Sequence, residues 1–222
     1  MRPGSPSVSE SLSLVAHQFE DLEQQHTAAW LGMWIFLATE IMFFGGMFAG
    51  YALYRWSYSA AFAAASRELE VVLGATNTLV LICSSLTMAL AVHAAETGRR
   101  RRLIGLVLAT MALGAVFLGV KGIEYLHKFQ HHLVPGTAFT FAAPFQRTAQ
   151  IFFSFYFALT GMHALHMVIG EGLLAALVIR AWRMEFTPEH HAAVEITGLY
   201  WHFVDIVWIF LFPLLYLIER HR

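Results

Sequence analysis

Charged residues are scarce in this sequence. Asp, Glu, Lys and Arg together make up 13% of its 222 residues, about half the share typical of soluble domains, whereas hydrophobic residues make up 58%. The net charge of −1 offers no basic surface for nucleic acid. The single cysteine, Cys83, excludes an intrachain disulfide. The composition therefore favours a membrane protein, and we expect no nucleic-acid partner.

Signatures of secretion and of common enzyme classes are also missing. The sequence contains no nucleotide-binding loop, no thiol cluster and no nucleophile–base arrangement. Residues 1–26 form a polar N-terminal segment without the apolar core and cleavage site of a signal peptide. Apolar residues recur there at helical spacing, which predicts a short amphipathic surface helix. They are Leu12, Val15, Phe19 and Leu22.

Five apolar segments are each long enough to cross a bilayer as one helix. They occupy residues 28–54, 71–95, 103–125, 149–180 and 196–218, and each exceeds the ~20 residues that a crossing needs. Backbone groups inside hydrocarbon must be hydrogen-bonded within their own segment, so spans of this kind are helices. We predict an all-α membrane protein, with a bundle of five transmembrane helices in one domain over residues 27–222.

Four consecutive arginines predict the orientation. Residues 99–102 lie in a short loop between the second and third spans, and loops rich in Lys and Arg stay on the inner side of the membrane. This places the N-terminus inside and, after five crossings, the C-terminus outside.

Ionisable side chains recur inside the predicted spans. Each costs roughly 2.5–3.5 kcal/mol or more in hydrocarbon, so we expect them to face protein, water or another subunit. His202 and Asp205 are three residues apart and share one helix face. Lys121 and Glu124 have the same spacing and can pair within one helix. The candidate proton-linked or buried polar residues are Glu40, Lys121, Glu124, His163, His166, Glu171, His202 and Asp205.

The first two spans carry further candidates. Glu40 lies near the middle of the first span, where a carboxyl is protonated, bonded to a partner helix or part of a proton route. Gly46 and Gly50 form a small-xxx-small face that lets another helix approach closely. The polar residues of the second span are expected to bond across helices or to their own backbone carbonyls. They are Thr76, Asn77, Thr78, Ser84, Ser85 and Thr87.

The histidines admit two interpretations. His163 and His166 can share a helix face, as metal ligands do, and either can pair with His93 or His202 around a haem. His93 lies near a membrane edge and His163 near the middle, which disfavours that pairing. We favour histidines that hydrogen-bond at helix contacts, and we predict no catalytic, cofactor-binding or metal-binding residue in this chain.

Several of these segments resemble ordered motifs of subunit III of the haem–copper oxidases, the cytochrome c oxidase type. The resemblance covers about residues 27–219. It rests on YWHFVDIVWIFLF at 200–212, GMHALHMVIG at 161–170, FLATEIMFFGG at 36–46, NTLVLICSSLTMA at 77–89 and GIEYLHKF at 122–129. In that family subunit III carries neither haem nor copper. It packs beside the catalytic subunit I, which reduces oxygen to water and pumps protons.

The resemblance implies a role in proton uptake, in stability of the catalytic subunit and in binding phospholipid. Glu40 matches the family's carbodiimide-reactive carboxyl. The positions that match the family's other polar residues are Glu124, His163, His166, His202 and Asp205.

The expected function is thus that of a non-catalytic subunit of a terminal respiratory oxidase. The usual long form has seven helices, and this chain begins at the equivalent of the third. Five-helix forms are similar to subunit III of quinol oxidases and of some bacterial cytochrome c oxidases, and related short proteins accompany nitric oxide reductases. Those assemblies are the alternatives, with a free-standing haem b protein as a third. We expect haem and copper in the partner subunit and a location in a bacterial cytoplasmic membrane.

Overall fold

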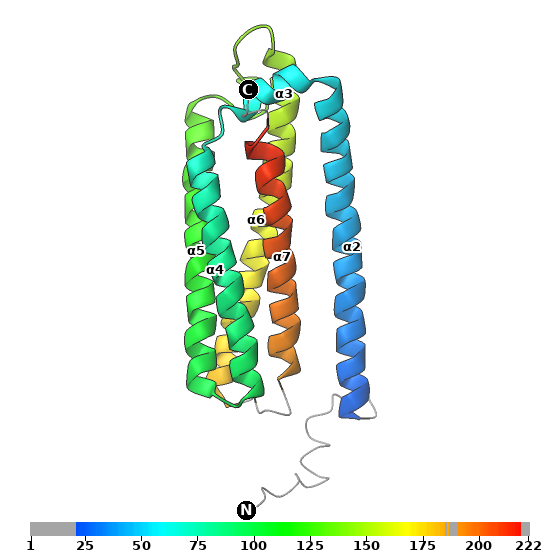
Figure 1. Cartoon of the computed structure of the whole chain (residues 1–222), viewed down its shortest axis with the longest axis vertical. Helices are drawn as coiled ribbons and strands as arrows, with labels where there is room; N and C mark the ends of the chain where they lie inside the picture. The colour runs from blue at the N-terminus through cyan, green and yellow to red at the C-terminus, as the bar shows by residue number, and fades with distance from the viewer. Residues whose placement is uncertain (1–20, 185, 187–190, 219–222) are drawn as a thin grey trace, which may run out of the picture. The chain divides into compact units, whose positions relative to one another are not determined.

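The computed structural model describes residues 21–184, 186 and 191–218, which contain six helices and no strand (Figure 1). The helices are α2 (Leu22–Ser57), α3 (Ser59–Ser66), α4 (Val71–Glu96), α5 (Arg100–Gln130), α6 (Gln146–Trp182) and α7 (Ala192–Tyr216). The amphipathic helix expected over residues 12–22 lies outside the described residues, apart from its last position, where α2 begins.

Five of these helices are long and apolar enough to cross a membrane, which confirms the all-α, five-span prediction. They are α2, α4, α5, α6 and α7. Each helix is longer than the apolar segment that predicted it. The helix α2 begins six residues earlier than expected, at Leu22. Large apolar side chains are exposed on the outer faces of α4–α7, as lipid contact requires. Examples are Leu79, Val116, Ile123, Val168 and Ile169, and on α7 the aromatic Phe210. The predicted orientation of the termini stays a prediction.

The chain divides into two units, residues 1–41 and 42–222. In the first unit, the described residues form the start of α2, where the Asp21 carboxylate accepts a hydrogen bond from the Gln24 amide at 2.7 Å. An acceptor in this position satisfies one of the free N–H groups at a helix start.

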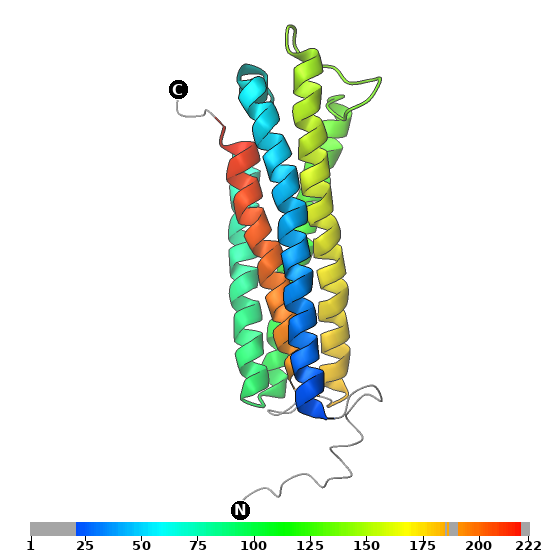
Figure 2. The ribbon, with the colours of Figure 1, turned by 90° about the vertical axis from the view of Figure 1, so that its right-hand side faces the viewer.

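The second unit is built around a ring of four helices. The helix α4 packs against α5 and α7, α6 packs against the same two, and α3 rests on α6. Both ribbon views show α4 and α7 side by side (Figures 1 and 2). The buried side chains at the centre of the ring are mainly aromatic, and they include Phe117, Tyr156, Trp201, Trp208 and Tyr216.

A glycine turn joins α4 to α5. Gly98 has a φ of 65°, and the amides of Gly98 and Arg99 donate to the carbonyls of Ala95 and Ala94 at 3.0 and 2.8 Å. These two bonds form a Schellman motif, whose left-handed position favours glycine. The next residue, Arg100, donates to the carbonyls of Ala181 and Trp182 at the end of α6. Arg100, one of the four arginines that predict the orientation, therefore also connects the start of α5 to the end of α6.

Polar side chains of α4 link it to its neighbours. The indole of Trp201 donates to the Ser84 hydroxyl at 2.9 Å, and that of Trp208 donates to Thr78 at 3.1 Å. The amide of Asn77 donates to the Phe117 carbonyl of α5 at 3.3 Å. These contacts confirm that the polar residues of the second span bond across helices, because buried N–H and O–H groups need partners.

Candidate functional site: polar contacts between the helices

The most heavily bonded polar group of the second unit is a buried lysine. Lys121 Nζ donates to Glu124 Oε2 at 2.9 Å, to the Tyr216 hydroxyl at 2.9 Å and to the Tyr156 hydroxyl at 3.1 Å. Tyr216 in turn donates to Glu124 Oε1 at 2.6 Å. Lys121 and Glu124 are 4% and 3% exposed. All three ammonium protons have acceptors, so the charge pair predicted from the spacing is present and fully bonded.

This cluster connects three helices. Lys121 and Glu124 lie on α5 and Tyr156 lies on α6. Tyr216 is the last residue of α7. A second buried cation, Lys128, donates to the backbone carbonyl of Glu68 after α3. The arrangement pairs Lys121 with Glu124 and gives Lys128 a backbone acceptor, and its chemistry is that of a structural clamp.

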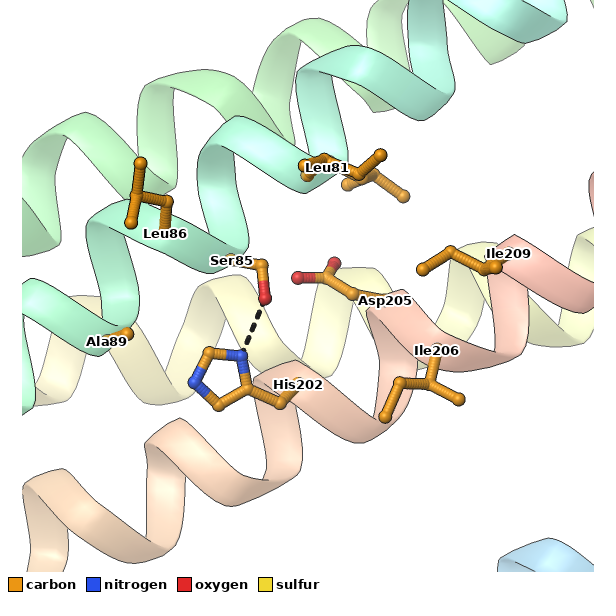
Figure 3. A pocket seen from close by; sticks show the side chains of 9 residues that line it. Leu81, Ser85, Leu86, Ala89, His202, Asp205, Ile206 and Ile209 are labelled. Atoms are coloured by element: carbon orange, nitrogen blue, oxygen red, sulfur yellow. Dashed lines mark hydrogen bonds between the residues drawn. The ribbon is translucent and has the colours of Figure 1, made fainter.

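A second polar group lines an open groove between α4 and α7. The Ser85 hydroxyl and His202 Nδ1 are 2.7 Å apart, and the Asp205 carboxylate lies beside them (Figure 3). Asp205 is 3% exposed, and neither of its oxygens has a hydrogen bond of normal geometry from the described residues. The structure thus brings His202 and Asp205 to one face, as their spacing predicted, and the Ser85 hydroxyl that bonds His202 is also the group that interacts with the Asp205 carboxylate.

The two histidines of α6 have different surroundings. His163 is buried between Phe117 and Trp208, with ring centroids 5.4 and 5.2 Å away. Neither of its ring nitrogens has a hydrogen-bond partner among the described residues, which differs from the expected hydrogen-bonded histidine. His166 Nδ1 is 2.8 Å from the Met162 carbonyl of its own helix, and its ring packs 5.4 Å from Phe44. The aromatic contacts of His163 leave no open face for a large ligand.

Glu171 of α6 lies against Gly114 of α5, beside Trp201 of α7. A Cβ atom added at Gly114 would be 2.1 Å from Glu171 Oε1 and 2.8 Å from the Trp201 ring. The same ring would lie 2.9 Å from a Cβ added at Gly170. Close contacts of this kind require glycine at both positions.

The candidates of the first span fall on both sides of the division between units. Glu40 belongs to the first unit, and Gly46 and Gly50 belong to the second. A Cβ atom at Gly50 would lie 3.5 Å from the Phe155 ring of α6. At Gly46 no heavy atom of the described residues lies within 4 Å of that position. Within the second unit, the small-residue face therefore meets another helix at Gly50.

In the described part of the chain, side-chain atoms of the kind that bind metal ions come close together where α4 ends and α7 begins. Glu96 at the end of α4 and His191 and Glu195 at the start of α7 have ligand-type atoms within 4.8 Å of one another. His191 Nε2 and Glu195 Oε1 are 3.0 Å apart, so these two half-buried side chains pair with each other across one turn of α7.

Sequence reasoning missed the partners of the buried charges. Tyr156 and Tyr216 complete the bonding of Lys121 from α6 and α7, and Gly114 makes room for Glu171 and Trp201. Only helix rotation and depth bring these residues together, and neither is encoded by spacing within one span. A tyrosine in an apolar span is a weak signal, because its hydroxyl must find a partner when buried.

Fold and polar contacts together define an integral membrane protein, a helical bundle in which a buried Lys–Glu pair connects three of the helices. The family model described as cytochrome c oxidase subunit III matches residues 16–219. The chain belongs to the cytochrome c oxidase subunit III family.

Curated relatives agree with this assignment. Cytochrome c oxidase subunit 3 of Gadus morhua is 34% identical over 200 residues, which covers 83% of this chain and 67% of the cod protein. The protein of the same name from Papio hamadryas is 34% identical over 199 residues, with the same coverage. That of Marchantia polymorpha is 31% identical over 198 residues and is covered to 66%. This chain therefore spans about two thirds of the length of these relatives.

Proposed function

We propose that this chain is a non-catalytic subunit of a cytochrome c oxidase complex, where it binds beside the catalytic subunit and supports its stability and proton uptake. The observation that supports this proposal is that the buried ionisable side chains contact other side chains of this same protein. Lys121 and Glu124 bond to each other and to two tyrosines, and His163 is enclosed by aromatic rings. Side chains that are already bonded or packed between helices are poor ligands for a redox centre.

The proposal assigns the redox cofactors to other polypeptides. Haem and copper would belong to the catalytic subunit I, and this chain would bind membrane phospholipid along its apolar outer faces. The bacterial cytoplasmic membrane stays our prediction for its location, and fractionation of the source cells tests it.

Purification of a tagged form of the chain tests this function. Mild detergent extraction is expected to recover a complex with a haem-bearing polypeptide, whereas the chain stripped from that complex should show no Soret absorbance. Stoichiometric haem in the stripped chain, or recovery of the chain with no haem-bearing companion, would contradict the proposal.

The proton-linked role of Glu40 gives a second test. Replacing Glu40 with Gln removes the one ionisable group at mid-span of the first helix, so we expect assembly to be preserved while carbodiimide labelling at this site is lost and proton uptake by the complex slows. The matched variant is Glu171→Gln, a carboxyl in α6, which should keep the label on Glu40. Equal labelling of the wild type and the Glu40→Gln variant would rule out this role.

A further inference from the structure

We propose that the groove between α4 and α7 binds one transmembrane helix of another subunit, and that this helix donates a hydrogen bond to Asp205. The inference rests on the proposed function and names the surface through which the chain would join its complex. It begins from the residues of the groove, which we call the α4–α7 groove. They are Leu81, Ile82, Ser85, Leu86, Ala89, His202, Asp205, Ile206 and Ile209.

The α4–α7 groove is apolar with a polar centre. It has a volume of about 390 Å³, and its polar side chains are Ser85, His202 and Asp205. Figure 3 shows the Asp205 carboxylate and the His202 ring turned toward Ser85 between aliphatic walls. The Ser85 hydroxyl interacts with the Asp205 carboxylate, but it is shared with His202 Nδ1 at 2.7 Å, and neither Asp205 oxygen has a contact that meets the geometry of a full hydrogen bond within the described residues. A buried carboxyl in this state is costly unless an outside group supplies the hydrogen bond.

Depth in the membrane limits what that group can be. Asp205 lies near the middle of α7 (Ala192–Tyr216), roughly 16–20 Å from either end at a rise of about 1.5 Å per residue. Lipid headgroups begin about 15 Å from the bilayer centre, and acyl chains contain no hydrogen-bond donor. Bulk water is absent at that depth. Of the groups that can lie along the groove within the membrane, a protein helix is the one that carries hydrogen-bond donors.

A second copy of this chain fits the groove poorly. A two-fold contact through the same surface would set one groove against another, so that neither is filled. A helix of different sequence, with a hydrogen-bond donor at mid-span and small or aliphatic residues around it, complements the groove better.

Crosslinking in the intact complex tests the proposal. A photoreactive amino acid replaces Ile206, which lines the groove and is 51% exposed. The matched control replaces Val116, which is equally exposed, at 51%, on α5. We expect the Ile206 position to give a crosslink to a transmembrane segment of another subunit, identified by mass spectrometry, in greater yield than the control.

The variant Asp205→Leu supplies an independent measurement. Loss of the hydrogen bond to this buried carboxyl should weaken retention of the chain in the complex after detergent extraction by about tenfold. Crosslinks from Ile206 only to lipid or to a second copy of this chain, in a complex that still holds its haem-bearing subunit, would overturn the docking inference and leave the proposed function standing. Material without any haem-bearing polypeptide would overturn the proposed function instead.

Discussion

Replacing Lys121 with methionine is expected to destabilise the bundle by about 3–5 kcal/mol, because the change leaves a buried carboxylate without its cation. Glu124 is 3% exposed, and one of its oxygens is bonded to Lys121 at 2.9 Å. The methionine also removes the donor shared by Tyr156 and Tyr216. Thermal unfolding of the purified protein in detergent, followed by circular dichroism, measures the effect.

Two further variants test whether the loss of stability comes from the unpaired buried charge of Glu124. The exposed Arg101, at the start of the same helix α5, should tolerate methionine with a change within about 0.5 kcal/mol. The double variant Lys121→Met with Glu124→Leu should recover much of the lost stability, since replacing both members of a buried ion pair by apolar residues is often neutral. A Lys121→Met variant as stable as the Arg101 variant would show that the pair is not a clamp.

Replacing Gly114 with alanine is expected to cost about 1–3 kcal/mol, because an added methyl overpacks the contact among α5, α6 and α7. Its Cβ would lie 2.1 Å from Glu171 Oε1 and 2.8 Å from the Trp201 ring. The carboxylate can swing away, but the indole is fixed by its bond to Ser84 at 2.9 Å. The near-ultraviolet circular dichroism of the tryptophans should change together with the midpoint of thermal unfolding.

The control for this prediction lies on the same helix. A Cβ added at Gly119 meets no heavy atom of the described residues within 4 Å, so Gly119→Ala should be neutral or stabilise the helix by up to about 1 kcal/mol. Adding Glu171→Ala to Gly114→Ala should restore only part of the stability, since the Trp201 contact remains. Equal stability of Gly114→Ala and Gly119→Ala would contradict the packing described for Gly114.

The five spans could be predicted from sequence because length and apolar content alone decide whether a helix crosses a membrane. The pairing of Lys121 with Glu124 was equally accessible, since residues three apart on a helix are neighbours whatever surrounds them. Contacts that depend on the rotation of a facing helix were not accessible. Tyr216 reaches Lys121 from α7, and no pattern within either span indicates that meeting.

The glycines show the same limit. Gly46 and Gly50 have the spacing of a helix-contact motif, yet in the second unit only Gly50 lies near a facing side chain, Phe155. The closest approaches among the described glycines occur at Gly114, Gly74 and Gly170, none of which has a glycine four residues away. Gly114 and Gly170 face Trp201, and Gly74 faces Phe212. A small residue permits close packing, but the large residue opposite it determines where packing occurs. Spacing within one helix carries no information about that partner.

His163 illustrates how polar residues in a span can mislead. Sequence alone leaves open a metal ligand, a haem ligand and a hydrogen-bonded contact. In the structure the imidazole packs between Phe117 and Trp208, so it serves as an aromatic ring of the core. Its two nitrogens have no hydrogen-bond partner among the described residues, and its position is determined by the rings packed around it.

A structure of the purified complex by electron cryomicroscopy tests the central claim most directly. We predict that the ionisable side chains of this chain contact its own helices and those of a neighbouring subunit, with every iron and copper atom bound by other polypeptides. Iron or copper ligated by His163, His166 or His202 of this chain would contradict that claim.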